Sequence, residues 1–272
     1  MKKERVDVLL VKQGLFETRE QAKRAVMAGE ILGVNEERLD KPGVKIDSTT
    51  KLHFKGKKMP FVSRGGYKLA KALKSFQLSP KGKIMLDIGA STGGFTDVAL
   101  QNGAALSYAL DVGTNQLAWK IRQDERVIVM ENTNFRYSKL ADFKHGRPEF
   151  ATIDVSFISL ELILPPLHEI IEPNGDVIAL IKPQFEAGRE NVGKHGIVHD
   201  PKVHQQVLTE ILSFALAAGF DVCGLDFSPI TGGEGGNIEF LVHLKAAVAP
   251  GKLAEQVKLS EIVTAAHENF KN

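Results

Sequence analysis

The segment that most constrains the fold of this 272-residue chain is IMLDIGASTGGFTD, residues 84–97. An apolar run ends at Asp87, and a loop that contains Gly89, Gly93 and Gly94 follows directly. Glycines at such a turn let the backbone approach a ligand, because they carry no Cβ atom and accept positive φ angles. A buried strand, a glycine-rich turn and a helix in this order are typical of Rossmann-like nucleotide sites.

The loop lacks the residues with which similar loops bind phosphates. A dinucleotide-binding loop, G-x-G-x-x-G, would place its second glycine where this chain has Ser91. A P-loop would need a lysine directly after Gly94, and Phe95 stands there instead. We therefore expect S-adenosylmethionine (SAM), a nucleoside without phosphates. The loop and its flanks supply the expected contacts, namely Asp87, Gly89, Ser91, Gly93, Gly94, Phe95 and Thr96.

From residue 83 onward, short apolar runs alternate with amphipathic segments, which is typical of a parallel sheet covered by helices. We expect strands at 84–88, 106–111, 127–130, 150–154, 176–181, 222–227 and 238–244. We expect helices at 68–76, 94–101, 117–122, 160–171 and 202–217. Seven strands in this order predict an α/β, Rossmann-like SAM-dependent methyltransferase fold with a mostly parallel sheet, in a domain of residues 61–272.

Polar residues end the predicted strands at the edge where ligands of open α/β sheets bind. Asp111 ends the second strand, 24 residues after Asp87, where an acid commonly binds ribose hydroxyls. Asn132 follows the third strand and is placed to contact the adenine edge, and Asp154 ends the fourth strand. We predict these three residues as further SAM contacts.

Residues 1–60 form a basic segment that we expect to be a separate small domain. It carries 14 Lys and Arg against 9 Asp and Glu, whereas the remaining residues carry 21 against 24. Apolar spacing predicts one helix in 5–15 and a second from an N-cap at Thr18 to Gly29. Short β-like runs at 31–34, 44–46 and 52–54 then predict a small hairpin, before the basic boundary stretch KGKKMP. The charge imbalance favours binding to a polyanion.

This basic segment resembles the αL RNA-binding module of the fourth small-subunit ribosomal protein. The matching features are R-x-D-x-L-L-V near the start, then T-R-x-x-A-K-x-x-x-x-A-G, and a turn with V-N. In that family the second helix packs against the RNA backbone, through contacts that do not read sequence. The resemblance implies phosphate contacts by Arg5, Lys12, Arg19, Lys23 and Arg24.

Four polar residues from distant segments suggest chemistry at one sheet edge. Lys68 lies in SRGGYKL, Asp154 in TIDVSF, Lys182 in LIKPQFE and Glu239 in GGNIEF. Because Asp154 and Lys182 end neighbouring predicted strands, we expect their side chains to lie close together. The order K, D, K, E on this fold resembles ribose 2′-O-methyltransferases of the FtsJ type. With the N-terminal αL module, the whole chain is similar to the TlyA family, also called haemolysin A.

This resemblance implies methylation of the ribose of cytidine in ribosomal RNA, with ribosomal RNA or ribosomal subunits as partners. The ribose hydroxyl must attack the sulfonium methyl group in line, so alignment is a large part of catalysis. We hypothesise that Lys182 acts as the general base or steers the hydroxyl. Repulsion from Lys68 would favour a neutral Lys182, whereas Asp154 and Glu239 hold both ammonium groups and favour the charged form. Both roles for Lys182 therefore stay open.

Two glycine-rich segments, EAGRENVGKHGIVHDP and TGGEGGN, are expected to frame the substrate. Arg189 and Lys194 of the first segment are predicted to hold RNA phosphates, as is Arg64 in SRGGYKL. Ordinary surface loops are the alternative interpretation of both segments.

Other residues could bind a metal or stack on a base. His195 and His199 are four apart, but the glycine between them and a following Asp-Pro argue against a helix that presents both, so we expect no metal site. Phe157, Tyr67 and Trp119 are candidates for base stacking, although packing in the core is favoured for each.

Composition excludes several classes of protein. The lone Cys223 excludes a disulfide framework and a cysteine zinc cluster. No stretch approaches 18 uncharged apolar residues, and charges interrupt the opening MKKERVDVLL, so we expect a cytoplasmic protein, monomeric and without membrane contact. The alternatives are a small-molecule SAM methyltransferase, a membrane-active haemolysin-like protein, and an RNA-binding module whose methyltransferase body has lost activity.

Overall fold

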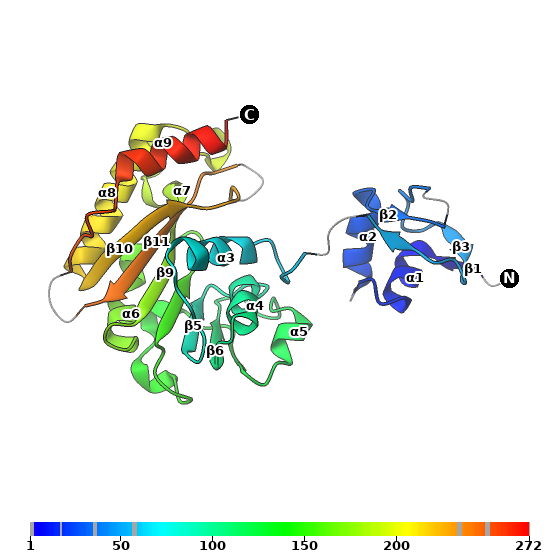
Figure 1. Ribbon diagram of the computed structural model, residues 1–272, viewed down its shortest axis with the longest axis horizontal. Coiled ribbons are helices and arrows are strands. Elements are labelled where there is room, and N and C mark those ends of the chain that lie inside the picture. Colours follow the sequence, from blue (N-terminus) through cyan, green and yellow to red (C-terminus); the bar gives the residue numbers. More distant parts are fainter. Residues whose placement is uncertain are drawn as a thin grey trace. The chain divides into compact units, whose positions relative to one another are not determined.

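A computed structural model describes residues 3–16, 18–34, 37–55, 59–232, 236–247 and 251–271. The chain divides into two units, Met1–Pro60 and Phe61–Asn272, and each is described here by itself (Figure 1). Parts of three sequence predictions lie outside the described residues. They are the asparagine of the V-N turn, the middle of KGKKMP and the centre of TGGEGGN.

The N-terminal unit is built around two short helices. Its elements are β1 (Lys3–Arg5), α1 (Val6–Lys12), α2 (Arg19–Met27), β2 (Ile31–Leu32), β3 (Lys45–Asp47) and β4 (His53–Phe54). Thr18 caps α2 as expected, because its side chain accepts a hydrogen bond from the backbone N–H of Gln21, whose side chain accepts one from the Thr18 N–H. Val6, Leu10 and Val26 are among the buried side chains that hold the two helices together.

The expected hairpin at the end of this unit is wrong. β3 pairs with β1, and β4 pairs with β2, both in antiparallel fashion. β1 precedes both helices and was not predicted. Strands of two or three residues carry too little apolar pattern to indicate which earlier segment they will pair with.

The second unit contains a seven-stranded sheet, which confirms the predicted fold class. The strands are β5 (Ile84–Ile88), β6 (Leu106–Leu110), β7 (Val127–Met130), β8 (Phe150–Ile153), β9 (Asp176–Ile181), β10 (Phe220–Phe227) and β11 (Phe240–Ala246). Their order is β10-β11-β9-β8-β5-β6-β7. β11 is antiparallel to both neighbours, and the other pairs are parallel.

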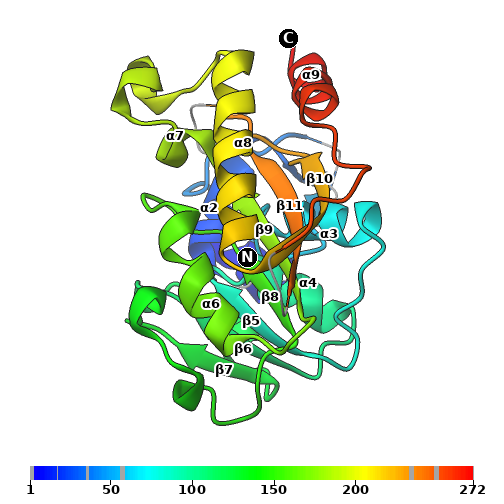
Figure 2. The same cartoon turned by 90° about the vertical axis from the view of Figure 1, so that its left-hand side faces the viewer.

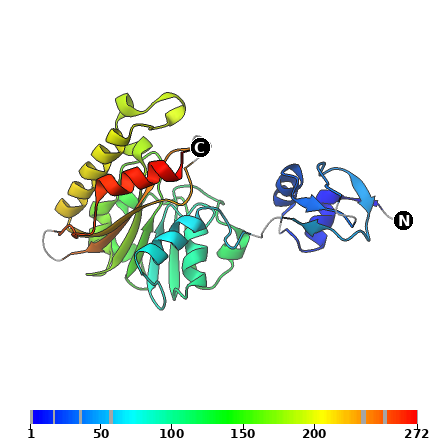
Figure 3. The ribbon, with the colours of Figure 1, turned by 45° about the horizontal axis from the view of Figure 1, so that its top comes forward.

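Helices cover both faces of this sheet (Figure 2). They are α3 (Gly66–Ser75), α4 (Gly94–Gln101), α5 (Trp119–Arg122), α6 (Leu164–Ile170), α7 (Pro183–Glu186), α8 (Pro201–Ala217) and α9 (Leu259–Asn269). Alternate residues along the strands point to opposite faces, so α6, α8 and α9 share one core while α3 and α4 share another. α9, which was not predicted, packs beside α8 (Figure 3).

Prolines and caps explain where the helices begin. Asp200 caps α8 by accepting the N–H of Lys202, and Pro201 occupies the first turn, as the sequence indicated. The helix expected over 160–171 is divided into a 3₁₀ turn, Leu160–Leu162, and α6. Two prolines in the first turn of α6 lack N–H groups, so a new helix begins there. Within the described residues, no helix is long and apolar enough to span a bilayer.

Candidate active site

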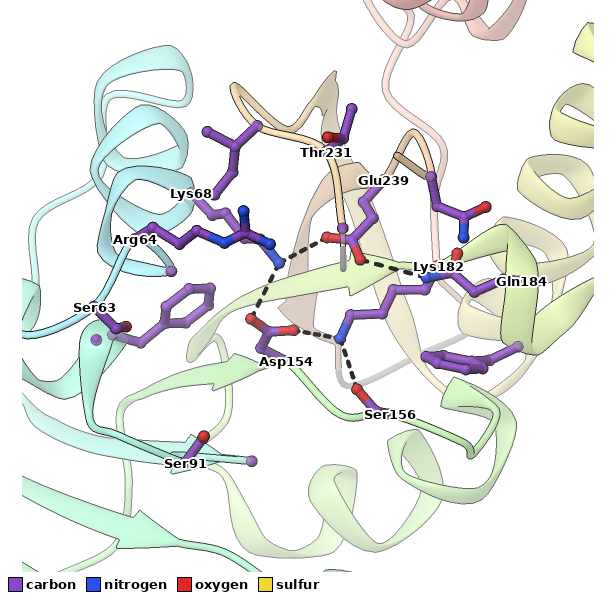
Figure 4. A pocket seen from close by; sticks show the side chains of 18 of the residues that line it. Ser63, Arg64, Lys68, Ser91, Asp154, Ser156, Lys182, Gln184, Thr231 and Glu239 are labelled. Atoms are coloured by element: carbon purple, nitrogen blue, oxygen red, sulfur yellow. Dashed lines mark hydrogen bonds and ion pairs between the residues drawn. The ribbon is translucent and has the colours of Figure 1, made fainter. Parts of the chain in front are cut away.

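A cavity of about 740 Å³ opens at the carboxyl ends of the parallel strands (Figure 4). The glycine loop after β5 forms one part of its wall, and the polar residues that follow β8 and β9 form another. The start of α3 and the segment before β11 complete it. This volume is typical of small-molecule sites, and its position is where ligands of open α/β sheets bind.

The four residues predicted to carry the chemistry meet in this cavity. Lys182 Nζ lies 2.6 Å from Asp154 Oδ1, and Lys68 Nζ lies 2.6 Å from Glu239 Oε2. Lys68 Nζ also lies 3.4 Å from the other oxygen of Asp154. Asp154 therefore bridges the two lysines, and we call these four residues the tetrad (Figure 4).

The tetrad is largely buried and internally charge-balanced. Its side chains are 9% exposed for Lys68, 8% for Lys182, 3% for Glu239 and 19% for Asp154. Burial alone would lower the pKa of Lys68, but the carboxylates of Asp154 and Glu239 outweigh it and raise that pKa above its usual value. Burial alone would raise the pKa of Asp154, but Lys68 and Lys182 outweigh it and lower that pKa. Lys68 and Asp154 are thus both held in their charged forms.

Packing of the surrounding elements fixes each member of the tetrad. α3 carries Lys68 and lies on the sheet through buried Leu69 and Ala72. One turn along α3, Lys71 Nζ donates hydrogen bonds to Asp226 at 2.9 Å and to the Phe227 carbonyl at 2.6 Å, which ties α3 to β10. The other three members directly follow or precede central strands of the sheet, next to residues that the hydrogen-bonded ladder holds.

The glycine loop packs directly against the tetrad. Gly89 has a φ of 86°, and a Cβ atom there would lie 2.6 Å from the backbone oxygen of Asp154. A Cβ atom on Gly94 would lie 2.3 Å from Ser63 Oγ, just before α3. Glycine is required at these positions because a side chain would push the loop away from two segments that line the cavity. The loop and the tetrad therefore form one continuous wall of the cavity.

Two of the predicted cofactor contacts lie behind this wall. Asp87 and Thr96 are fully buried. Asp87 Oδ2 accepts hydrogen bonds from the Thr96 N–H at 3.0 Å and hydroxyl at 2.7 Å, and its Oδ1 accepts one from Thr152 at 2.8 Å. Burial raises the pKa of Asp87 to about 6, against the lowering effect of these hydrogen bonds. Neither residue lines the cavity, and the hydrogen bonds between them join the end of β5 to the start of α4.

The other predicted cofactor contacts line the cavity or adjoin it. Gly89, Ser91, Gly94 and Phe95 line it. Asp111 accepts the Ser91 N–H at 2.8 Å and the Gly113 N–H at 2.7 Å, which holds the glycine loop against the end of β6. Asn132 is exposed, and its N–H donates to the Gly113 carbonyl. Gly93, with a φ of 92°, packs against Leu117 rather than facing the cavity.

The predicted phosphate contacts of the N-terminal unit mostly carry acidic partners. Arg5 and Arg19 both donate to the buried carboxylate of Asp7, at 2.9 Å and 3.0 Å. Lys12 pairs with Glu4, and Lys23 pairs with Glu20. Arg24 is exposed on α2.

In the second unit, Arg64 lines the cavity at the start of α3. Arg189 and Lys194 are exposed on the segment after α7. Their neighbour His195 lines the cavity with a φ of 64°. Asn237 holds this segment, because its side chain accepts the Val198 N–H and donates to the Gly196 carbonyl. Within the described residues, no group of three potential metal ligands comes together.

Comparisons with protein families and with known proteins show to which family this chain belongs. The FtsJ-like methyltransferase family model matches residues 61–246, and the S4 domain model matches residues 4–51. The chain belongs to the TlyA family of FtsJ-like methyltransferases. It is 39% identical to the Mycobacterium tuberculosis 16S/23S rRNA (cytidine-2′-O)-methyltransferase TlyA, over 89% of each chain.

Two further TlyA-like proteins match the chain over almost its whole length. YqxC of Bacillus subtilis, provisionally named an rRNA methyltransferase, is 63% identical over 99% of this chain and 96% of its own. A solved structure from Streptococcus thermophilus, provisionally assigned as a hemolysin, is 60% identical and has a TM-score of 0.78. It covers 99% of this chain and 98% of its own.

Sequence reasoning misjudged three aromatic residues, one of which, Phe157, lines the cavity of this TlyA-family protein. Packing in the core was favoured for Phe157, Tyr67 and Trp119, but they are 90%, 38% and 66% exposed. Phe157 lines the cavity with a φ of 63° and packs on Phe185, with 4.9 Å between ring centroids. A bulky side chain in the left-handed region is a strained arrangement, and such strain concentrates at functional sites.

Ser156 is a residue of the site that sequence reasoning missed. It lines the cavity, and its Oγ accepts a hydrogen bond from Lys182 Nζ at 3.2 Å. The available signal was its place two residues after Asp154, where the chain leaves β8 at the ligand-binding edge.

Proposed function

We propose that this protein transfers the methyl group of SAM to the 2′-hydroxyl of a cytidine ribose in ribosomal RNA. One observation carries the proposal: a balanced tetrad of two lysines and two acids shares a cavity wall with the glycine loop. The activity named for the M. tuberculosis relative supplies the nucleoside and the type of RNA. The match of an S4 domain to residues 4–51 supports an RNA substrate.

The residues around the glycine loop fit SAM better than a phosphorylated nucleotide. The described cavity wall has no lysine or arginine between Gly89 and Phe95, where phosphates would need countercharge. Asp111 lies at the end of β6 and, with two lone-pair positions already used by backbone N–H groups, can still accept hydrogen bonds from ribose hydroxyls. When bound, SAM supplies a methyl group that its positive sulfur has already activated.

The remaining task of the protein is to orient the hydroxyl and take its proton. We assign this task to Lys182, which reaches the cavity from the end of β9. One carboxylate oxygen of Asp154 contacts Lys182, and the other contacts Lys68. The Asp154 carboxylate is therefore held in place and in turn positions the nitrogen of Lys182. Lys68 is held as an ammonium ion by two carboxylates, and we assign it an electrostatic role rather than that of a base.

Other residues of the cavity are suited to hold an RNA strand. Phe157 offers an exposed ring that packs on the half-buried Phe185, and a base turned out of its helix can stack on such a ring. Arg64 at the start of α3 is placed for a backbone phosphate. The S4-like unit would add contacts that strengthen binding without selecting a sequence.

The alternative activities are less well supported. A small-molecule methyltransferase would not need the S4 domain, and no observation on the described residues favours a membrane-active protein. The intact tetrad argues against a body that has lost its activity.

The direct test supplies labelled SAM and ribosomal subunits that lack the modification. We expect one label per subunit, in an alkali-resistant dinucleotide, because a methylated 2′-oxygen cannot attack the adjacent phosphate. Equal transfer to free cytidine would support the small-molecule alternative, and label on a base would contradict the assignment. Leakage from liposomes at the same protein concentration tests the membrane-active alternative.

A further inference from the structure

Lys182 and Lys68 are held by different kinds of acceptor. Lys68 Nζ contacts two carboxylates, those of Glu239 and Asp154. Lys182 Nζ contacts one carboxylate oxygen, on Asp154, and the neutral hydroxyl of Ser156 at 3.2 Å. Both acceptors of Lys182 lie on the short segment that follows β8, two residues apart. Figure 4 shows Asp154 to the left of the lysine nitrogen and Ser156 below it.

This arrangement leaves one direction open at the lysine nitrogen. An amine nitrogen is tetrahedral, and its bond to the side chain occupies one of four positions. Asp154 Oδ1 and Ser156 Oγ take two more, and the described residues provide no further hydrogen-bond acceptor for Lys182. In a neutral amine, two N–H groups then point at these acceptors, and the lone pair occupies the fourth position.

We propose that Ser156 is a positioning residue that turns this fourth position of Lys182 toward the ribose 2′-hydroxyl. The inference rests on the proposed function. As the 2′-oxygen forms its bond to the methyl carbon, the bond from that carbon to sulfur breaks and the sulfur leaves as a neutral thioether. The hydroxyl proton passes to the lone pair of Lys182, and the resulting ammonium ion releases a proton to water.

The chemical nature of Ser156 fits this role better than an acid would. A second carboxylate would favour the ammonium form of Lys182, as the pair of carboxylates does for Lys68. A hydroxyl accepts the hydrogen bond but brings no negative charge, so it orients the nitrogen with less bias toward the charged form. Ser156 is also exposed, so substitutions there should leave the fold intact.

The experiment compares Ser156→Ala with Ser156→Thr, which keeps a hydroxyl, and with Ser260→Ala, a control at an exposed serine of α9. The methylation rate is measured at saturating SAM over a range of concentrations of unmodified ribosomal subunits. SAM affinity is measured by calorimetry and folding by thermal unfolding. For Ser156→Ala we expect kcat to fall about tenfold, with KM for subunits and the Kd for SAM within twofold of wild type. Ser156→Thr should recover most of the rate, and Ser260→Ala should match wild type.

A fourth variant, Ser156→Asp, adds a charge that favours the ammonium form of Lys182. It should move the rising limb of the pH profile of kcat to higher pH. A wild-type kcat in Ser156→Ala would overturn the proposal. A raised KM with unchanged kcat would also overturn it, because Ser156 would then be an RNA contact. A Ser156→Thr variant as slow as Ser156→Ala would overturn it as well. Failure of the proposed function would appear differently, as absent methyl transfer by the wild-type protein.

Discussion

Each of the two units of this protein places an acid between two cations, but the cations are exposed in one unit and buried in the other. In the N-terminal unit, Asp7 is fully buried and accepts hydrogen bonds from Arg5 and Arg19, whose side chains are 41% and 53% exposed. In the second unit, Asp154 lies between two lysines whose side chains are 9% and 8% exposed. The local pairing is alike, and the burial of the cations is what separates the two clusters.

This difference fits the two roles we propose, RNA binding for the first cluster and catalysis for the second. The Arg5–Asp7–Arg19 cluster carries a net positive charge, and each guanidinium keeps free N–H donors that face solvent, which suits a phosphate. The tetrad pairs its two lysines with two acids, so it has no excess of cations that would attract a polyanion. Arginine remains charged at any accessible pH, whereas a buried lysine can give up its proton.

Removal of the reactive lysine should have the largest effect. We expect Lys182→Ala to lower kcat by about a thousandfold, the usual range for loss of a general base, while the Kd for SAM stays within a fewfold. Lys182→Arg keeps a cation that cannot act as a base, so residual activity in it would favour steering over proton transfer.

The matched control for Lys182 is Lys83→Ala. Lys83 pairs with Asp176 at 2.8 Å, at the opposite end of β9 from Lys182. The Lys83→Ala variant should methylate ribosomal subunits at the wild-type rate. Equal losses of SAM binding and turnover in Lys182→Ala would remove the assignment of Lys182 to proton transfer or steering.

Removal of the exposed cations should act on RNA binding and on the stability of the N-terminal unit, but not on the chemical step. We expect the double variant Arg5→Ala with Arg19→Ala to raise KM for ribosomal subunits about tenfold and leave kcat unchanged. The slope of log affinity against log salt should become shallower by about 1.4 to 1.8, since each lost phosphate contact contributes about 0.7 to 0.9. Arg38→Ala, at an exposed arginine paired with Asp40, is the control. A loss confined to kcat would contradict the contrast between the clusters.

Local signals explain why the reactive cluster could be predicted. A glycine at a strand end indicates a close backbone approach, and Gly89 does lie against the backbone of Asp154. Parallel strands bring their carboxyl ends to one edge, so Asp154 and Lys182 had to be neighbours once both were placed after strands. The positions of Lys68 and Glu239 came from resemblance to a family, because neither lies at the end of a parallel strand.

Other features depend on information that the sequence does not display. Asp87 lies beside the cofactor loop, yet it points into the core, because the buried Thr96 and Thr152 bind its carboxylate. The exposure of Phe157 goes against the usual burial of aromatic residues, and its φ of 63° depends on how the chain turns after β8. Likewise, the pairing of β1 with β3 depends on tertiary contacts that outweigh the weak pattern of three-residue strands.

The acid of the N-terminal cluster should matter for stability more than for catalysis. The hydrogen bond from Arg5 is the main cause that lowers the pKa of Asp7 to about 2, against the effect of burial. A lowered pKa stabilises the folded unit above about pH 4, and this contribution is lost as the pH falls toward 2. We expect Asp7→Asn to destabilise the N-terminal unit by about 1–3 kcal/mol, since two arginines lose a charged acceptor.

Amide hydrogen exchange of α1 in the full chain at neutral pH measures this loss. Asp40→Asn, at an exposed acid, is the control. Unchanged protection of α1 in Asp7→Asn would show that Asp7 contributes nothing to holding the unit together.

The smallest expected effect on stability concerns a buried histidine, His204, which forms no ion pair with a carboxylate among the described residues. His204 on α8 is fully buried, and its Nδ1 lies 2.9 Å from Nε2 of His267 on α9. Burial, followed by repulsion from His267, lowers the pKa of His204 to about 4; Asp200 acts in the opposite direction, and His199 in the same one. Unlike Lys68, which its carboxylates hold in the charged form, His204 therefore stays neutral above about pH 4 in the folded protein.

The sign of the pH effect follows from that lowered pKa. Below about pH 6.5 the unfolded chain binds a proton at His204 that the folded chain does not, so stability falls as the pH falls toward 4. Between pH 7 and pH 6 this group should cost about 0.7 kcal/mol of unfolding free energy. Urea unfolding at both pH values should show a smaller loss in His204→Gln than in wild type, by that amount. Histidines that do not contact His204 cancel in the difference, and the same pair of measurements in a His267→Gln background removes the contribution of His267. An identical loss in the two proteins would then mean that His204 is protonated in the folded state despite its burial.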